Sequence, residues 1–130
     1  MRLVLSALLL VLVAGCDRGP LVVQPGGFTQ SDLTVTLRAD GTAVFVLQSS
    51  PRRTQKLLDG RWQQAGPDGA TIEIRVTASS APTSYRKGDL FRFAYDGDRL
   101  VFIDRRGRDG MVLEDAASRK GVSWVMTRVE

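Results

Sequence analysis

The sequence predicts an all-β fold, a single small antiparallel meander β-barrel. From Ser31 onward, apolar and polar residues alternate in short runs, the pattern of strands with one buried face. Asp-Gly pairs, which suit tight hairpin turns, separate many of these runs. The chain has 130 residues, which is enough for one hydrophobic core and too few for two. We expect roughly six to eight strands that close into a barrel, because closure removes exposed sheet edges.

Residues 1–15 have the order of a secretory signal sequence. Arg2 gives a positive start, residues 3–13 are apolar apart from Ser6, and two small residues follow. A helix over residues 3–13 would span about 16 Å at ~1.5 Å per residue, roughly half of a bilayer core. The segment is therefore too short for a transmembrane anchor and indicates export.

The end of this segment, Val13-Ala14-Gly15-Cys16, resembles the lipobox of bacterial lipoproteins. In that family the cysteine thiol receives a diacylglycerol and the cysteine becomes the new N-terminus. Cys16 is the only cysteine of the chain, and we expect it to be lipidated. Two or three acyl chains hold a protein durably, since each buried methylene contributes ~0.8 kcal/mol. The resemblance implies a membrane-anchored lipoprotein of the bacterial cell envelope that faces the periplasm, on either the inner or the outer membrane.

After the signal sequence, residues 16–30 are expected to form the lipidated cysteine and a flexible tether. Their prolines and glycines disfavour regular structure, and such spacers let an anchored domain stand off its membrane. A short edge strand at residues 21–23 is the alternative. The barrel domain is placed at residues 31–130.

The expected strands follow one another with short connections. Glycine tolerates the positive φ that tight turns demand, and aspartate suits the position before it. No segment has the pattern of a long amphipathic helix. The expected strands are residues 33–37, 43–47, 60–64, 71–77, 91–95, 100–103, 111–113 and 122–129, and the expected turns are Asp40-Gly41, Asp59-Gly60, Asp68-Gly69, Asp96-Gly97 and Asp109-Gly110.

Aromatic side chains are expected to fill the barrel. Trp62, Trp124, Phe91 and Phe93 stand at inward positions of expected strands, and aromatic residues with a period of two are usually core. A barrel of ~8 strands is just wide enough to hold one small molecule. A cavity for a small ligand is therefore the alternative to a filled interior.

A series of short motifs follows in order along the chain: Leu33-Thr34-Val35-Thr36-Leu37, Asp40-Gly41-Thr42, Gly60-Arg61-Trp62, Ile72 with Ile74, and residues 100–104 with Gly107. Their order resembles the N-terminal barrel domain of NlpE-type copper-resistance lipoproteins, and more widely the small lipocalin-like barrels. In lipocalin-like proteins a Gly-x-Trp pair starts a strand that plugs one end of the barrel. The resemblance implies the barrel fold. The CxxC pair of the NlpE family is absent before the first expected strand, so copper binding is not carried over.

Composition excludes several kinds of chemistry. The chain has no histidine and one cysteine, which excludes Ser-His-Asp and Cys-His nucleophiles, histidine-ligated metals, internal disulfides and CxxC redox sites. No glycine-rich phosphate loop occurs. We therefore expect no catalytic residue, no metal and no cofactor. The expected function is a non-enzymatic binding or structural module, in envelope maintenance or stress sensing.

Two other classes of function stay open. A carboxylate-dependent enzyme would use Glu73 and Asp104, which lie in or at the end of expected strands rather than in turns. Metal handling would depend on Met111 and Met126, the only soft ligands left once Cys16 is a thioether. Asp96 and Asp98 flank a glycine and offer oxygens to Ca²⁺, but an ordinary turn is preferred there.

Basic residues group in two expected loops. Arg52, Arg53 and Lys56 form one group. Arg105, Arg106 and Arg108 form the other and are the expected contacts for a ligand or partner. Arginine tips suit lipid headgroups, anionic polysaccharide or an acidic protein surface. Export excludes nucleic acid, so the expected partners are the membrane, through the lipid on Cys16, and an envelope protein or a small apolar ligand.

Overall fold

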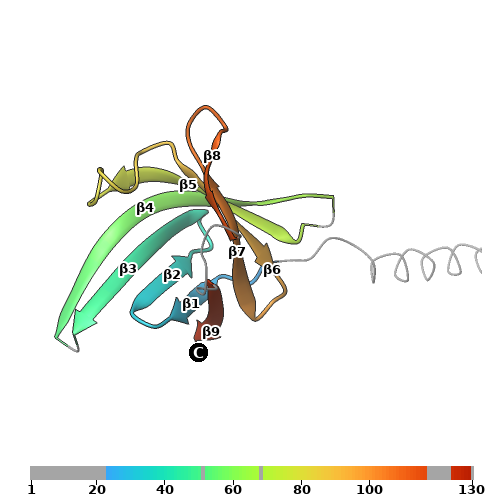
Figure 1. Ribbon diagram of the computed structural model, residues 1–130. Coiled ribbons are helices and arrows are strands. Elements are labelled where there is room, and N and C mark those ends of the chain that lie inside the picture. Colours follow the sequence, from blue (N-terminus) through green and yellow to red (C-terminus); the bar gives the residue numbers. More distant parts are fainter. Residues whose placement is uncertain (1–22, 51, 68, 117–123, 130) are drawn as a thin grey trace, which may run out of the picture.

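The computed structural model describes residues 23–50, 52–67, 69–116 and 124–129, which form an all-β barrel (Figure 1). The sheet has nine strands, and the pairing of β6 with β7 closes it. None of the described residues belongs to a helix that could cross a bilayer. The expected signal sequence and Cys16 lie outside the described residues. The strands are β1 Gly26–Gln30, β2 Leu33–Leu37, β3 Thr42–Ser50, β4 Arg53–Ala65, β5 Thr71–Ser79, β6 Leu90–Tyr95, β7 Arg99–Arg106, β8 Val112–Asp115 and β9 Val125–Val129.

Eight strands close the barrel and β8 is added outside the ring. All neighbours are antiparallel, in the order β1 to β7, then β9, which pairs with β1 again. One edge of β7 is divided between two partners: Arg99–Val101 pair with β9 and Asp104–Arg106 pair with β8. The predicted antiparallel barrel is confirmed. β8 overlaps the strand expected at residues 111–113 but lies outside the ring, and β1 is the strand beyond the expected number.

The barrel begins earlier in the chain than the sequence indicated. β1 pairs with both β2 and β9, Phe28 is wholly buried, and Val23 belongs to the core. The prediction that the tether runs to Gln30 is therefore wrong for residues 23–30. Because Phe28 stands among glycines and polar residues, this strand shows no alternating pattern. The rest of the predicted tether, residues 16–22, lies outside the described residues.

Antiparallel pairing gives the barrel two different ends. β1, β3, β5 and β7 run toward one end, which we call the loop end; it carries the 80–89 connection and the β7–β8 hairpin, which projects from the barrel in Figure 1. The opposite end, where β1 begins and β9 finishes, is called the N-terminal end. The chain therefore enters the barrel at the end opposite the long connections.

The inward face is packed with aromatic rings. Phe91 and Phe93 are fully buried, and their ring centroids lie 6.4 Å apart. Phe45 reaches Phe91 with a centroid distance of 5.1 Å. The two tryptophans, expected in the same core, are partly buried and pack against its edge; Trp124 meets Phe102 edge to face at 5.0 Å.

Trp62 holds the β2–β3 turn at the N-terminal end. Its indole Nε1 donates to the Arg38 carbonyl at 2.8 Å, and its backbone N–H donates to the Gly41 carbonyl at 2.9 Å. Within that turn, the Thr42 hydroxyl and N–H donate to Asp40 at 2.6 and 2.9 Å. These hydrogen bonds lower the pKa of the Asp40 carboxyl, because they favour its charged form. The half-buried indole thus packs against the core with its N–H satisfied and ties the β2–β3 turn to β4.

Four of the expected Asp-Gly turns carry a glycine at positive φ, at Gly41, Gly69, Gly97 and Gly110. The fifth prediction is wrong, because Asp59 and Gly60 lie inside β4 at an irregularity of its pairing with β5. A side chain at Gly60 would approach the Arg75 carbonyl oxygen to 2.8 Å. This glycine is required for close strand approach rather than for a turn.

Candidate functional site

A bulge in β7 decides which side chains face the loop end of the barrel interior. Phe93 is paired with Phe102, whereas the next position, Arg92, is paired with Asp104, so Ile103 is the extra residue. Beyond it, Arg105 lies opposite the inward-facing Phe91. The bulge therefore turns Arg105 toward the interior and Asp104 toward the outer face, the reverse of an unbroken alternation.

Arg105 is fixed between two carboxylates and a ring. Its Nη1 lies 2.9 Å from Asp89 Oδ2 and its Nε lies 3.1 Å from Glu114 Oε1. Its guanidinium carbon stands 5.2 Å from the centre of the Tyr85 ring, which itself packs against Phe91. The Arg105 side chain is only 14% exposed and that of Asp89 only 5%. Such a shielded, hydrogen-bonded cluster holds its members in one geometry.

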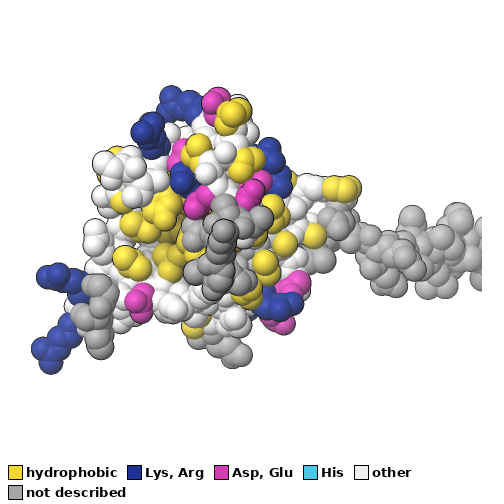
Figure 2. Space-filling model, viewed as in Figure 1, with side chains coloured by type: hydrophobic (Ala, Val, Ile, Leu, Met, Phe, Trp, Pro, Cys, Tyr) yellow, Lys and Arg dark blue, Asp and Glu magenta, His cyan; other side chains and the backbone are white. Residues whose placement is uncertain are grey.

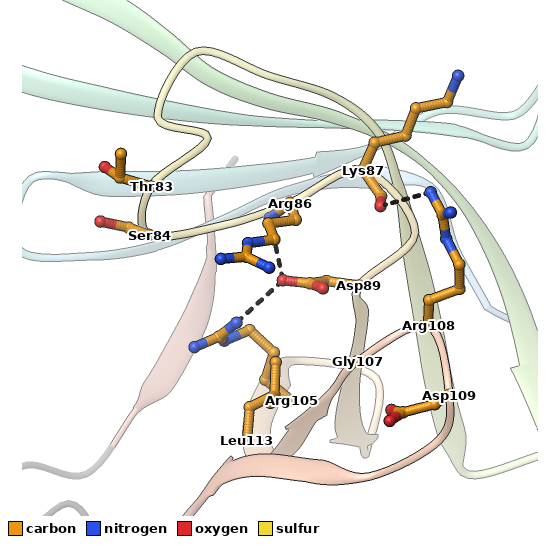
Figure 3. Close-up of a pocket in the computed structure, with 10 residues that line it drawn as sticks. All are labelled: Thr83, Ser84, Arg86, Lys87, Asp89, Arg105, Gly107, Arg108, Asp109 and Leu113. Atoms are coloured by element: carbon orange, nitrogen blue, oxygen red, sulfur yellow. Dashed lines mark hydrogen bonds and ion pairs between the residues drawn. The ribbon is translucent and has the colours of Figure 1, made fainter.

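Arg105 and Asp89 of this cluster form the floor of an open groove of about 1030 Å³ at the loop end. One wall is the connection between β5 and β6, and the other is the β7–β8 hairpin; Figure 3 shows Arg105 reaching from the hairpin side to Asp89 on the connection side. The lining residues are Thr83, Ser84, Arg86, Lys87, Asp89, Arg105, Gly107, Arg108, Asp109 and Leu113.

Arg108 bridges the two walls. Its Nη2 donates to the Lys87 carbonyl at 3.3 Å (Figure 3). Gly88 makes this contact possible, because a Cβ there would lie 2.9 Å from Arg108 Nε. Gly88 also has a φ of 97°, which L side chains rarely adopt. The glycine thus lets the arginine lie against the backbone of the opposite wall.

The exposed charge of the groove is positive. Arg86, Lys87 and Arg108 are exposed, and none of them has an ion pair with a carboxylate in the described part of the chain. Asp109, the exposed acid, has its Oδ1 engaged by the Met111 N–H at 3.0 Å. Figure 2 shows basic side chains gathered around the projecting hairpin and the neighbouring connection. The only large apolar side chain of the lining is Leu113, which is 52% exposed.

The structure separates the three arginines expected to act together. Arg105 and Arg108 line the groove, whereas Arg106 pairs with Asp104 at 3.3 Å outside it. The prediction that all three lie in one loop is wrong, because Arg105 and Arg106 belong to β7. The other basic group stands on the β3–β4 hairpin, where Lys56 pairs with Asp59 at 2.9 Å.

The two carboxylates proposed for an enzyme are not in the groove. Glu73 and Asp104 stand on either side of Arg92 in the strand register, two strand spacings or about 10 Å apart. Gln63 donates to Glu73 at 3.0 Å. Arg92 Nε lies 3.2 Å from Asp104 Oδ1, although neither atom has a hydrogen-bond partner. We regard the contact as an ion pair with poor hydrogen-bond angles, in which Arg92 separates the two acids.

The residues considered for metal binding are also apart. Met126 is wholly buried opposite Leu100, near the N-terminal end, and Met111 is 65% exposed on the β7–β8 hairpin. Asp96 uses both carboxylate oxygens in its turn: Oδ1 accepts from the N–H groups of Asp98 and Arg99, and Oδ2 accepts from the Arg99 guanidinium. The Arg99 side chain is the main cause that lowers the pKa of Asp96. The described residues contain no group of three potential His, Cys, Asp or Glu ligands.

Sequence reasoning missed most of the groove. Asp89, Tyr85 and Glu114 stood outside every motif, and only the register brings them to Arg105. One weak signal was present: Asp89 directly precedes the β6 run and follows a glycine, as a loop acid does.

No protein-family model matches the chain, and no curated protein matches it.

Proposed function

We propose that the protein is a lipid-anchored cell-envelope lipoprotein whose barrel is a non-enzymatic binding module, with the groove at the loop end as its binding site. The observation that supports this is the groove itself, an open concavity of about 1030 Å³ whose floor is rigidly held by the Arg105–Asp89 pair. Pre-organised concave sites with a few oriented polar groups are typical of binding surfaces. A role in envelope maintenance or stress sensing is compatible with such a module.

The interior supports a protein partner more than a small apolar ligand. The Phe45 ring of β3 contacts the Phe91 ring of β6, and Phe93 stacks beside Phe91 on the same strand; a ligand of the lipocalin type would need this space. The open groove, by contrast, is lined mostly by charged and hydroxyl side chains. The favoured partner is therefore one that binds at the rim from outside.

The rival classes have less support. An enzyme built on Glu73 and Asp104 would need both acids at one shielded site, and Arg92 stands between them. Copper handling in the manner of the NlpE resemblance would need soft ligands close together, and Met111 and Met126 lie toward opposite ends of the barrel.

A lipid anchor at Cys16 would orient the groove relative to the membrane. Arg128 fixes the start of the domain at the N-terminal end: it donates to the carbonyls of Gln24 and Pro25 at 3.1 and 3.3 Å and to the Tyr95 hydroxyl at 3.1 Å. A chain from Cys16 to Val23 reaches at most about 25 Å. A lipid on Cys16 would therefore hold the N-terminal end toward the membrane and present the groove on the far side.

The anchor is tested by changing the cysteine. In Cys16→Ala, we expect loss of fatty-acid labelling and release of the protein from the membrane fraction, because no thiol remains for the diacylglycerol. Labelling and fractionation of the wild-type protein and the variant in the same cells measure this. Equal membrane retention of both proteins would contradict the anchor.

The groove is tested by crosslinking in the native envelope. A photo-crosslinking amino acid at Thr83, an exposed lining residue, should capture a partner. The same amino acid at Thr77, exposed on β5 and outside the groove, is the matched control. We expect an adduct at Thr83 that disappears when Arg108→Gln is added, and no such adduct at Thr77. Absence of any adduct at Thr83, or identical adducts at both positions, would refute binding at the groove.

A further inference from the structure

We infer that the groove binds an acidic, extended segment of a partner protein; this inference rests on the proposed function and names the chemistry of its partner. Three groups of observations lead to it: the uncompensated charge of the groove, its size and shape, and its place on the barrel relative to the N-terminus.

The charges divide into a buried cluster, in which one arginine is paired with two carboxylates, and a cationic rim. Arg105 is paired with both Asp89 and Glu114, so it adds no net positive charge for a ligand. Its role is that of a positioning residue, because it ties the connection and the hairpin together. The rim then carries three exposed cations, Arg86, Lys87 and Arg108, and one exposed acid, Asp109. A surface with this excess favours carboxylates in the partner.

The rim charges come from two walls and do not converge. Arg86 and Lys87 stand on the connection between β5 and β6, and Arg108 stands on the β7–β8 hairpin. In Figure 3 the Lys87 side chain points away from the Asp89 carboxylate, while Arg108 lies across toward Lys87. A site for a single phosphate would direct several donors at one point. Charges spread along a groove suit a chain with several acidic side chains.

The volume of the groove and its one large apolar side chain, Leu113, also favour a peptide. A groove of about 1030 Å³ is at the upper end of the range for drug-sized ligands, roughly 300–1,000 Å³. Leu113 lines this space and is half exposed, which would let an apolar side chain of the partner leave water. Alternation of acidic and apolar residues in an extended segment matches both features.

The place of the groove disfavours the anchoring membrane as its occupant. The Arg128 contacts hold residues 24 and 25 at the N-terminal end, and the groove opens at the loop end. With the lipid at Cys16, the cationic rim would face away from the headgroups to which the protein is attached. A protein segment in the periplasmic space is the occupant that remains within reach.

The test measures binding of a defined peptide to the full-length lipoprotein in nanodiscs. The probe is a fluorescein-labelled peptide, Glu-Leu-Glu-Leu-Glu-Leu, and its Gln-Leu analogue is the charge control. Fluorescence anisotropy should show saturable binding of the acidic peptide, weaker binding at high salt, and little binding of the analogue. The double variant R86Q/R108Q should weaken binding about tenfold, as expected for two exposed charge contacts.

The control variant removes the same charge elsewhere. Arg38 and Arg61 are exposed and lie near the β2–β3 turn at the N-terminal end, so R38Q/R61Q should leave the affinity within about twofold of wild type, since only close charges contribute strongly. Equal losses in both double variants would overturn the inference, because they would indicate unspecific attraction by net charge.

Inorganic phosphate and phosphatidylglycerol vesicles test whether the groove instead binds a simple anion or a membrane surface. Complete displacement of the peptide by millimolar inorganic phosphate would overturn the inference in favour of a simple anion site. Groove-dependent binding to phosphatidylglycerol vesicles without peptide binding would overturn it in favour of a membrane surface. If the peptide fails to bind but the Thr83 adduct persists, the partner chemistry is wrong and the proposed function stands; loss of the adduct itself rejects the proposed function.

Discussion

Phe91→Ala is expected to lower the free energy of unfolding by about 3–5 kcal/mol, the usual cost of removing a large buried ring. Phe91 is 0% exposed and its ring lies between Phe45, Tyr85 and Phe93, at centroid distances of 5.1, 5.7 and 6.4 Å. The cavity would also remove support from Tyr85, the ring beneath Arg105. Urea denaturation followed by tryptophan fluorescence measures the loss.

Phe91→Leu is the matched control, because it keeps most of the buried volume and should cost less than about 1.5 kcal/mol. A loss below about 1 kcal/mol for the alanine variant would mean that the barrel interior is loosely packed. In that case a small apolar ligand inside the barrel would regain support.

Asp89→Ala is expected to cost about 2–3 kcal/mol, because two hydrogen bonds to a buried carboxylate are lost while Arg105 keeps its ion pair with Glu114. Asp89 Oδ2 accepts from Arg105 Nη1 at 2.9 Å and from the Arg86 N–H at 3.0 Å. Both donors lose their acceptor in the variant, and among the described residues the two walls of the groove keep only one hydrogen bond, from Arg108 to the Lys87 carbonyl. Chemical denaturation, together with the crosslinking yield at Thr83, measures both effects.

Asp109→Ala serves as the comparison for Asp89→Ala. Asp109 lines the same groove but is exposed, and its Oδ1 caps the hairpin turn through the Met111 N–H. Loss of one such hydrogen bond should cost about 1 kcal/mol. If the two variants were equally stable, the Arg105 cluster would not hold the walls together.

The strands with a clear alternation were predictable from the sequence. Residues 33–37 were expected as a strand and form β2 with the same bounds. Phe91 and Phe93 were placed inward by a period of two, and both are fully buried. These predictions depend on local geometry alone, because successive side chains of a strand point to opposite faces.

Two local features were not predictable because they depend on pairing. β1 has one apolar side chain at its centre, Phe28, and becomes a strand because β2 and β9 both supply partners. The bulge at Ile103 leaves no mark in the sequence, because residues 100–103 are all apolar and nothing shows which of them is the extra one. Asp104 was considered for catalysis because it follows the end of an expected strand, and Arg105 was placed in a loop because that strand was expected to end at residue 103.

The sequence by itself determined the class of fold and the antiparallel order of its hairpins, because each depends on neighbouring residues; lipidation at Cys16 is a prediction from the same kind of local pattern. The groove was decided only by the tertiary structure. Arg105 meets Asp89, sixteen positions away, and Glu114, nine positions away, through the pairing of β6, β7 and β8 and the bulge that rotates β7. Which charges neutralise one another, and which stay exposed for a partner, follows from that register and from no pattern along the chain.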